Sequence, residues 1–145
     1  MQPITAFGAL VDGMPVTLVE QERPFVVFDF ETTGPDKSRD RILQFSFRKV
    51  SPTGDTVHFH GMLNPQQPIL ASATAVHGFT DADVADCPTF REVAEQMLQF
   101  LDGCDLVGFH ILSFDLPILL REFQSVGINW NYLAHRIIDV AGLYK

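Results

Sequence analysis

The chain has 145 residues, of which 46% are hydrophobic and 19% charged, a composition typical of one globular domain and not of a disordered chain. Its net charge of −8 has the wrong sign for a protein that binds long duplexes through charge alone, although bound divalent cations would supply positive charge locally. Cys87 and Cys104 form neither a zinc pattern nor a disulfide framework. No apolar run approaches the ~18 residues of a membrane helix, so we expect a cytoplasmic protein with reduced thiols and no membrane contact.

Residues 1–23 are weakly patterned, and we expect them to form an N-terminal arm or an edge hairpin. Asp12-Gly13 is a turn signal between two short apolar runs, 9–11 and 16–18. Pro15 argues against a central strand there. The first clear strand is Pro24 to Phe30, which opens the main domain, residues 24–145.

A β-hairpin is predicted next. Residues 41–50 and 56–63 alternate as strands do, and the turn residues 51–55 lie between them. His58 and His60 share one face of the second of these strands. Two histidines at this spacing can begin a metal site, but no third ligand lies near in sequence, so the expectation is a solvent-facing or half-buried pair.

Three helical segments are predicted after the hairpin. Residues 69–76 form a short helix or an irregular run, and Thr80 with Asp83 can cap a second short helix. Thr89 and Glu92 form a capping box for the clearest helix, which Gly103 ends. Its core-facing stripe repeats at helical spacing and consists of Phe90, Val93, Ala94, Met97, Leu98 and Leu101.

The second half of the chain alternates strands with helices. A strand at 105–109 follows a helix, as in a parallel crossover unit. A helix then runs from about 115 to 125, with Pro117 in its first turn. Residues 136–139 form a last short strand, and 140–145 begin a helix. The pattern predicts an α/β domain with a mixed sheet of about five strands and helices on both faces.

Two carboxylates stand at the end of the first strand. Asp29 and Glu31 are two residues apart, so their side chains point to the same face. Carboxylates held about 4 Å apart repel by roughly 4 kcal/mol at an effective dielectric of about 20. Hard oxygen ligands suit Mg²⁺ or Mn²⁺, so the pair indicates a metal site. The alternative is a strand end with two solvated acids.

Asp115 is a third candidate acid. It begins a helix directly after a strand and its loop, and α/β folds place their ligands at the carboxyl ends of strands. The alternative is an ordinary helix N-terminal Asp favoured by the helix dipole.

These acids lie in two motifs that resemble those of a known family. Phe-Asp-Phe-Glu-Thr-Thr-Gly at 28–34 resembles the first motif of the DEDD 3′–5′ exonucleases, which have a ribonuclease-H-like fold and include the proofreading subunit of bacterial replicative polymerases. Residues 107–119 look like the second motif, a Gly-aromatic-Asn run that leads into Phe-Asp. The tract from Asn64 through Thr80 to the helix at Phe90 also resembles the family. Together the resemblance covers about residues 25–145.

The resemblance implies two-metal hydrolysis of phosphodiester bonds. Asp29 would bridge two Mg²⁺ or Mn²⁺ ions, Glu31 would bind the first ion and orient the water, and Asp115 would bind the second. The terminal nucleotide would contact the segment after the first acid, the turn after residue 76 and the aromatic residue before Asp115. The substrate-binding residues implied are Phe30, Thr32, Thr33, Gly34, His77 and Phe114.

Two departures from the family pattern stand out. His110 occupies the place where the second motif usually has Asn. The third motif, a His or Tyr four or five residues before a last Asp, is missing. His135 and Asp139 have a similar spacing, but residues 137–140 look like the strand before the family's final helices. We therefore expect the third motif beyond Lys145, and a natural variant that lost it is the alternative.

The leading prediction is a metal-dependent 3′–5′ exonuclease acting on single-stranded DNA or RNA ends, with a polymerase or another protein as a partner. Without the last motif, the 145-residue chain itself is expected to be weak or inactive. The alternative is a non-catalytic module that binds nucleic acid or protein on the same fold. A structural domain with incidental acids is the third reading. The sequence does not choose between DNA and RNA.

Overall fold

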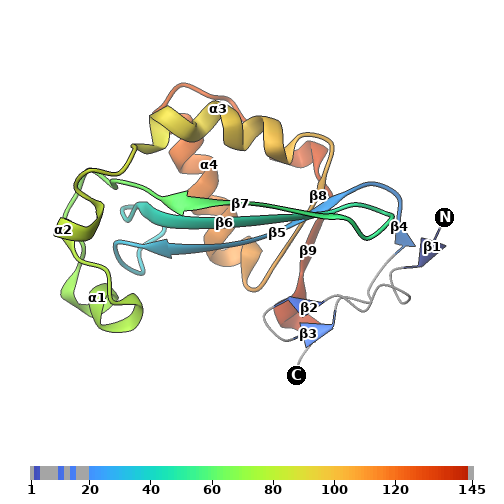
Figure 1. The fold of residues 1–145 in the computed structure, drawn as a ribbon, viewed down its shortest axis with the longest axis horizontal. Coiled ribbons are helices and arrows are strands. Elements are labelled where there is room, and N and C mark those ends of the chain that lie inside the picture. The colour runs from blue at the N-terminus through green and yellow to red at the C-terminus, as the bar shows by residue number, and fades with distance from the viewer. Residues whose placement is uncertain (1, 4–9, 12–13, 16–19, 144–145) are drawn as a thin grey trace.

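The computed structural model describes residues 2–3, 10–11, 14–15 and 20–143. Its centre is a mixed five-stranded sheet with the strand order β7-β6-β5-β8-β9 (Figure 1). β6 is antiparallel to β5 and to β7, whereas β8 is parallel to β5 and to β9. The predicted α/β fold with a mixed sheet is confirmed. The strands are β5 (Phe25–Thr32), β6 (Ile42–Val50), β7 (Thr56–Met62), β8 (Asp105–Gly108) and β9 (Ile137–Asp139).

The core is built from phenylalanine because β5 and β6 present aromatic rings on one face. Phe28 and Phe30 of β5 are buried and lie in register with Phe47 and Phe45 of β6. The Phe28 and Phe47 rings meet edge to face at 5.8 Å, and the Phe47 ring stacks on Phe100 at 6.1 Å. Strand alternation therefore turns the odd-numbered residues of β5, including both candidate acids, to the opposite face.

The two long helices, α3 (Phe90–Leu101) and α4 (Leu116–Ser125), pack on the face of the aromatic core. Their Phe90 and Phe123 rings touch edge to face at 5.4 Å. The sequence predicted helices on both faces of the sheet, whereas both long helices lie on one face. The crossovers β7–α3–β8 and β8–α4–β9 advance in the same direction across the sheet (Figure 1). Because such crossovers are right-handed, both place their helices on one face.

Two short helices, α1 (Ala71–His77) and α2 (Asp81–Val84), lie at the end of the sheet where β5 finishes (Figure 1). Both predicted capping boxes form. The Thr80 amide donates to the Asp83 carboxylate at 2.8 Å, and the Thr89 amide donates to Glu92 at 3.1 Å. No helix among the described residues is long and apolar enough to cross a membrane.

The described parts of the N-terminal segment form two small antiparallel ladders. β1 (Gln2–Pro3) pairs with β4 (Glu20–Gln21), and β2 (Leu10–Val11) pairs with β3 (Met14–Pro15). The pairing of β2 with β3 agrees with a hairpin at this place. Its turn, Asp12-Gly13, and residues 16–18 lie outside the described residues.

Three segments differ in detail from the sequence prediction. The link between β8 and α4 is a π-helical turn, η2 (Ile111–Asp115), where a plain connection was expected. The ambiguous stretch before β9 contains a 3₁₀ turn, η3 (Tyr132–Ala134). After β9 the chain forms a 3₁₀ turn, η4 (Val140–Leu143), and not the start of an α-helix. The last two residues of the predicted helix, 144–145, lie outside the described part.

Candidate functional site

β5 places two candidate acids at its carboxyl end. Asp29 is exposed and Glu31 is half-buried on the face opposite the aromatic core. The pairing with β6 shifts register between Glu31 and Thr32. A β-bulge of this kind bends and twists the strand. The irregularity thus lies where the strand presents its second carboxylate.

The third acid stands at the end of the π-helical turn. The amide of Leu116 donates to the carbonyl of Ile111, a five-residue step, and Asp115 is buried beside it. Single π-turns occur frequently at functional sites. His110, before this turn, adopts the left-handed conformation with φ 57°. Asn and His tolerate that conformation better than most residues, which gives a physical reason for His at a position where the resembling motif has Asn.

Asp139 holds the π-helical turn in place. Its carboxylate accepts hydrogen bonds from the amides of His110 at 3.0 Å, Leu112 at 3.3 Å and Ala141 at 3.1 Å. Since these backbone groups occupy both of its oxygens, the side chain has a structural task. This agrees with the interpretation of Asp139 as the acid of the last strand, outside the catalytic set.

His135 lies at the opposite end of β8 from Asp115. Its Nε2 accepts a hydrogen bond from the Trp130 indole at 3.2 Å, so its Nδ1 carries the proton and donates to the Cys104 carbonyl at 2.7 Å. Cys104 directly precedes β8, whereas Asp115 follows it. His135 is therefore not part of the acid cluster.

The three candidate acids are coupled electrostatically through Asp29. Burial first, and then the charges of Asp29 and Asp139, raise the pKa of Asp115 to about 8. Burial also raises the pKa of Glu31, with a further contribution from Asp29 and an opposing one from His77. Carboxyl groups from β5 and from the π-helical turn thus act on one another, although 86 positions separate Asp29 from Asp115 in the sequence.

The donor set fits a divalent cation by its chemistry. Among the described residues, no three His, Cys, Asp or Glu side chains are grouped closely enough to hold one ion. Asp29, Glu31 and Asp115 nonetheless supply hard oxygen ligands, the kind that Mg²⁺ and Mn²⁺ prefer. Their mutual repulsion is what a cation would relieve. These three residues are the candidates for holding a divalent cation, although their side chains are not close enough in this structure to share one ion.

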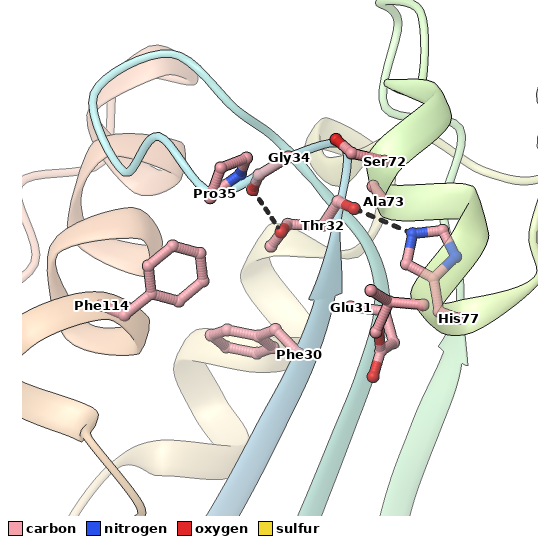
Figure 2. Close-up of a pocket in the computed structure, with 10 residues that line it drawn as sticks. Phe30, Glu31, Thr32, Gly34, Pro35, Ser72, Ala73, His77 and Phe114 are labelled. Carbon is pink, nitrogen blue, oxygen red and sulfur yellow. Dashed lines mark hydrogen bonds between the residues drawn. The ribbon is translucent and has the colours of Figure 1, made fainter.

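A cavity of about 400 Å³ adjoins Glu31 (Figure 2). Phe30 and Phe114 form one side of it, and Glu31 and His77 form the other. Most of the predicted substrate-binding residues line it. The full lining is Phe30, Glu31, Thr32, Gly34, Pro35, Ser72, Ala73, Val76, His77 and Phe114.

One wall of this cavity was not predicted from the sequence. Ser72, Ala73 and Val76 come from α1, which buries none of its residues, and Val76 is 85% exposed. No sequence signal marks them, because small and apolar residues on a short helix carry no chemical pattern. An exposed Val beside a cavity gains significance only from the structure.

His77 ties the wall of the cavity to the strand of acids. Its Nδ1 accepts a hydrogen bond from the Phe79 amide at 3.1 Å, so its Nε2 carries the proton and donates to the Thr32 carbonyl at 3.1 Å. These two hydrogen bonds fix the orientation of the ring. It positions the turn after α1 against the end of β5.

Thr33 lies outside the cavity lining and belongs to a buried network in the loop that follows β5. Its hydroxyl donates to the buried Asp40 carboxylate at 2.9 Å and accepts from the Arg41 amide at 3.0 Å. Asp40 also accepts from the Asp36 amide at 2.8 Å. The network fixes the loop, which in turn fixes the cavity wall at Gly34.

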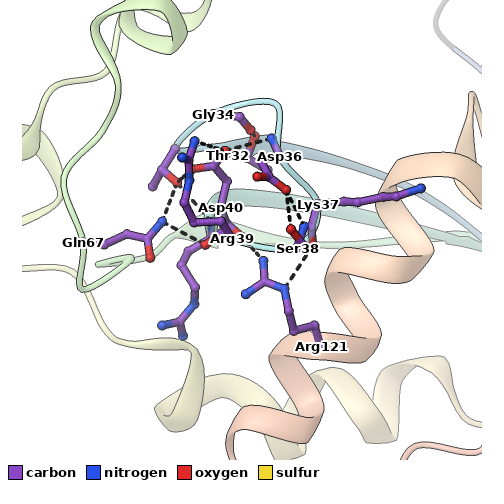
Figure 3. A network of polar contacts seen from close by, with 11 residues as sticks. Thr32, Gly34, Asp36, Lys37, Ser38, Arg39, Asp40, Gln67 and Arg121 are labelled. Carbon is purple, nitrogen blue, oxygen red and sulfur yellow. Dashed lines mark hydrogen bonds and ion pairs between the residues drawn. The ribbon is translucent and has the colours of Figure 1, made fainter.

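α4 holds the same loop from the other side. Arg121 donates to the carbonyls of Lys37, at 3.0 Å, and of Asp40 (Figure 3). The Lys37 ammonium donates back to the Ser113 carbonyl at 3.1 Å. The helix that begins after Asp115 is therefore bonded to the loop that follows Glu31.

The chain is similar to a known protein family and to several known proteins. A family model described as Exonuclease (RNase_T) matches residues 26–145. DNA polymerase III PolC-type from Caldanaerobacter subterraneus subsp. tengcongensis is 32% identical over 81% of this chain and 9% of that protein. A DNA polymerase III subunit epsilon-like protein from Rhodobacter capsulatus is 38% identical over 74% of this chain and 16% of that protein.

DNA polymerase III subunit epsilon from Pasteurella multocida is 31% identical over 80% of this chain and 48% of that protein. The chain thus spans less than half the length of each of these curated relatives. Among solved structures, E. coli Exonuclease I in complex with a dT13 oligonucleotide is similar in fold, with a TM-score of 0.72. It is 16% identical over 82% of this chain and 28% of that one.

Proposed function

The chain belongs to the RNase_T exonuclease family, and from this premise we propose that it removes nucleotides from the 3′ ends of single-stranded DNA or RNA. Residues 24–145 would form the exonuclease domain, with 1–23 as an arm at its edge. The curated relatives named above are a DNA polymerase III PolC-type, a DNA polymerase III subunit epsilon-like protein and a DNA polymerase III subunit epsilon. We therefore propose a polymerase complex as the partner and, with two free thiols, a cytoplasmic location.

The observation that carries this proposal is the placement of a buried acid, Asp115, within reach of the charge of Asp29. Burial, followed by the charges of Asp29 and Asp139, raises the pKa of Asp115 to about 8. A protein that keeps a buried acid next to another acid gives up stability unless a cation binds there. Perturbed acids of this kind cluster at functional sites.

The proposed roles follow from position. When bound, divalent ions activate the attacking water and stabilise the leaving 3′ oxygen. Asp29, whose charge acts on both other acids, would help to hold the ions. Glu31, which lines the cavity, would bind one ion and orient the water. Asp115 would bind the other ion once it has lost its proton.

The cavity would hold the terminal nucleotide. Its volume of about 400 Å³ lies within the usual range for small-molecule pockets. Phe30 and Phe114 offer aromatic faces, and bases stack on such faces without sequence preference. Thr32, Gly34 and His77 would bound the sugar and the base from the opposite side. This arrangement would receive a single-stranded end and not a paired duplex.

A directional degradation assay tests the proposal. A single-stranded oligonucleotide labelled at its 3′ end is incubated with the protein and Mn²⁺, in parallel with one labelled at its 5′ end. We expect labelled mononucleotide from the first and a ladder of shortened products from the second, formed slowly and at high protein concentration because these 145 residues lack the third motif. Asp29→Asn should abolish both, whereas Asp86→Asn, an exposed acid after α2, should not. A wild-type protein that binds the oligonucleotide but leaves it intact would favour the non-catalytic binding module, and internal fragments alone would contradict an exonuclease.

A further inference from the structure

β7 forms one edge of the five-stranded sheet and carries a histidine pair that the proposed exonuclease site does not use. His58 and His60 are two residues apart on this strand, so both project from the same face. Both side chains are exposed. Their rings are stacked, with centroids 4.2 Å apart and planes only 24° from parallel. Two imidazoles are thus already side by side and open to solvent.

A neighbouring hydroxyl orients one of the two rings. The Ser46 Oγ lies 2.9 Å from the Nε2 of His58. Metal-binding histidines usually make a second hydrogen bond with the nitrogen that does not bind the metal. When His58 donates through Nε2 to Ser46, the lone pair of its Nδ1 is left for an ion.

The surroundings of His58 favour its neutral form. Although the side chain is exposed, its slight desolvation, followed by the charges of His60 and Arg48, lowers the pKa of His58. Neutral imidazole is the metal-binding form. Arg48 lies in register with His58 on β6, and its positive charge reduces the affinity for any cation without blocking the ring nitrogens.

We propose that His58 and His60 together chelate a late first-row transition-metal ion: Cu²⁺, Ni²⁺ or Zn²⁺. Two nitrogens bound to one ion, each at about 2.1 Å, stand roughly 3 Å apart, so the two imidazoles, with centroids 4.2 Å apart, would rotate to turn one nitrogen each toward the ion. Imidazole suits these ions, whereas Mg²⁺ prefers oxygen ligands. Water would fill the remaining coordination positions, because the strand edge is open.

This histidine site is separate from the carboxylate site. Pairing across the sheet places Asp29 opposite Ser46, and Ser46 opposite His60. Two strand spacings, about 10 Å, therefore separate the backbones of Asp29 and His60. The ligand types also differ, so occupancy of the histidine site can be measured while Mg²⁺ is present in excess. The proposal does not depend on exonuclease activity.

Calorimetric titration of the tag-free protein with Ni²⁺ in excess Mg²⁺ tests the proposal. We expect one Ni²⁺ per chain, and His58→Gln and His60→Gln should each weaken binding at least about tenfold, because either change removes the chelate. Circular dichroism should be unchanged, since both side chains are exposed.

A matched control keeps the histidine count and changes the geometry. Val57 is 57% exposed, and the double variant V57H/H58V puts its two histidines on opposite faces of β7. We expect this variant to bind Ni²⁺ as weakly as His58→Gln does. Affinity equal to wild type in either single-histidine variant, or Ni²⁺ binding that is lost in Asp29→Asn but kept in His58→Gln, would overturn the proposal.

Discussion

Asp115 is a carboxyl group that the fold keeps away from water and close to other acids. Its burial and the charges of Asp29 and Asp139 raise its pKa from 3.8 to about 8. At neutral pH and without a cation the folded protein therefore favours the protonated acid. A bound divalent ion favours the ionised form, so metal binding and proton release are linked at this residue.

The stability of the metal-free protein should depend on pH through Asp115. Because the pKa of Asp115 is higher in the folded than in the unfolded state, protonated Asp115 stabilises the folded protein. This stabilisation is complete below the pKa of the unfolded state and is lost as pH rises toward about 8. Between about pH 4 and 8 the unfolding free energy should fall by up to about 1.4 kcal/mol per pH unit from this group. Urea denaturation in EDTA across this range measures it. Asp115→Asn should flatten the slope, and an unchanged slope would show that another group titrates.

Gly34 is required by close packing in the loop after β5. A Cβ at this position would lie 2.5 Å from the Asp40 Oδ2 and 2.7 Å from the Leu70 Cδ1. Gly34→Ala should lower the unfolding free energy by about 1–3 kcal/mol and distort the cavity wall. Pro35→Ala, an exposed change in the same turn, should cost less than about 1 kcal/mol. Equal midpoints for the two variants in thermal unfolding would contradict the packing account.

At the scale of elements, local signals were sufficient where the partners are close in sequence. The capping pair Thr89 and Glu92 marked the start of α3 because its two members are three residues apart. The π-helical turn could not be predicted in this way. Its geometry depends on Asp139, whose carboxylate bonds to the amide of His110 from 29 positions further along the chain. The wall formed by α1 escaped prediction for a similar reason, because only its position beside β5 gives it significance.

The attachment of α4 to the start of β6 should be a large contribution to stability. Glu122 is 1% exposed and accepts from the Arg41 guanidinium at 2.7 Å and from the Ile42 amide at 3.0 Å. Glu122→Ala would leave both donors without this acceptor and should lower the unfolding free energy by about 3–5 kcal/mol. Glu95→Ala, on the exposed side of α3, should change it by less than about 0.5 kcal/mol. Denaturant titration compares them, and similar losses would refute a special role for Glu122.

For the whole molecule, the sequence was sufficient to predict the mixed sheet, whereas the shared role of the three acids stays a prediction and their surroundings were not predicted. Alternation along β5 placed Asp29 and Glu31 together, and the order of strands and helices implied the mixed sheet. Both long helices lie on one face because successive right-handed crossovers run in one direction, a property of topology that no single segment displays. The cavity is assembled from β5, its following loop, α1 and Phe114, so it exists only in the folded chain.

We propose that Asp29, Glu31 and Asp115 together bind a divalent cation. Titration of the wild-type chain with Mn²⁺, followed by electron paramagnetic resonance of the free ion, measures this directly. We expect binding that strengthens from about pH 6 to 8 as Asp115 gives up its proton, and a loss of at least about tenfold in Asp29→Asn and in Asp115→Asn. Asp86→Asn should bind as wild type does. Binding curves that are the same for wild type, Asp29→Asn and Asp115→Asn would show that these acids do not bind the ion.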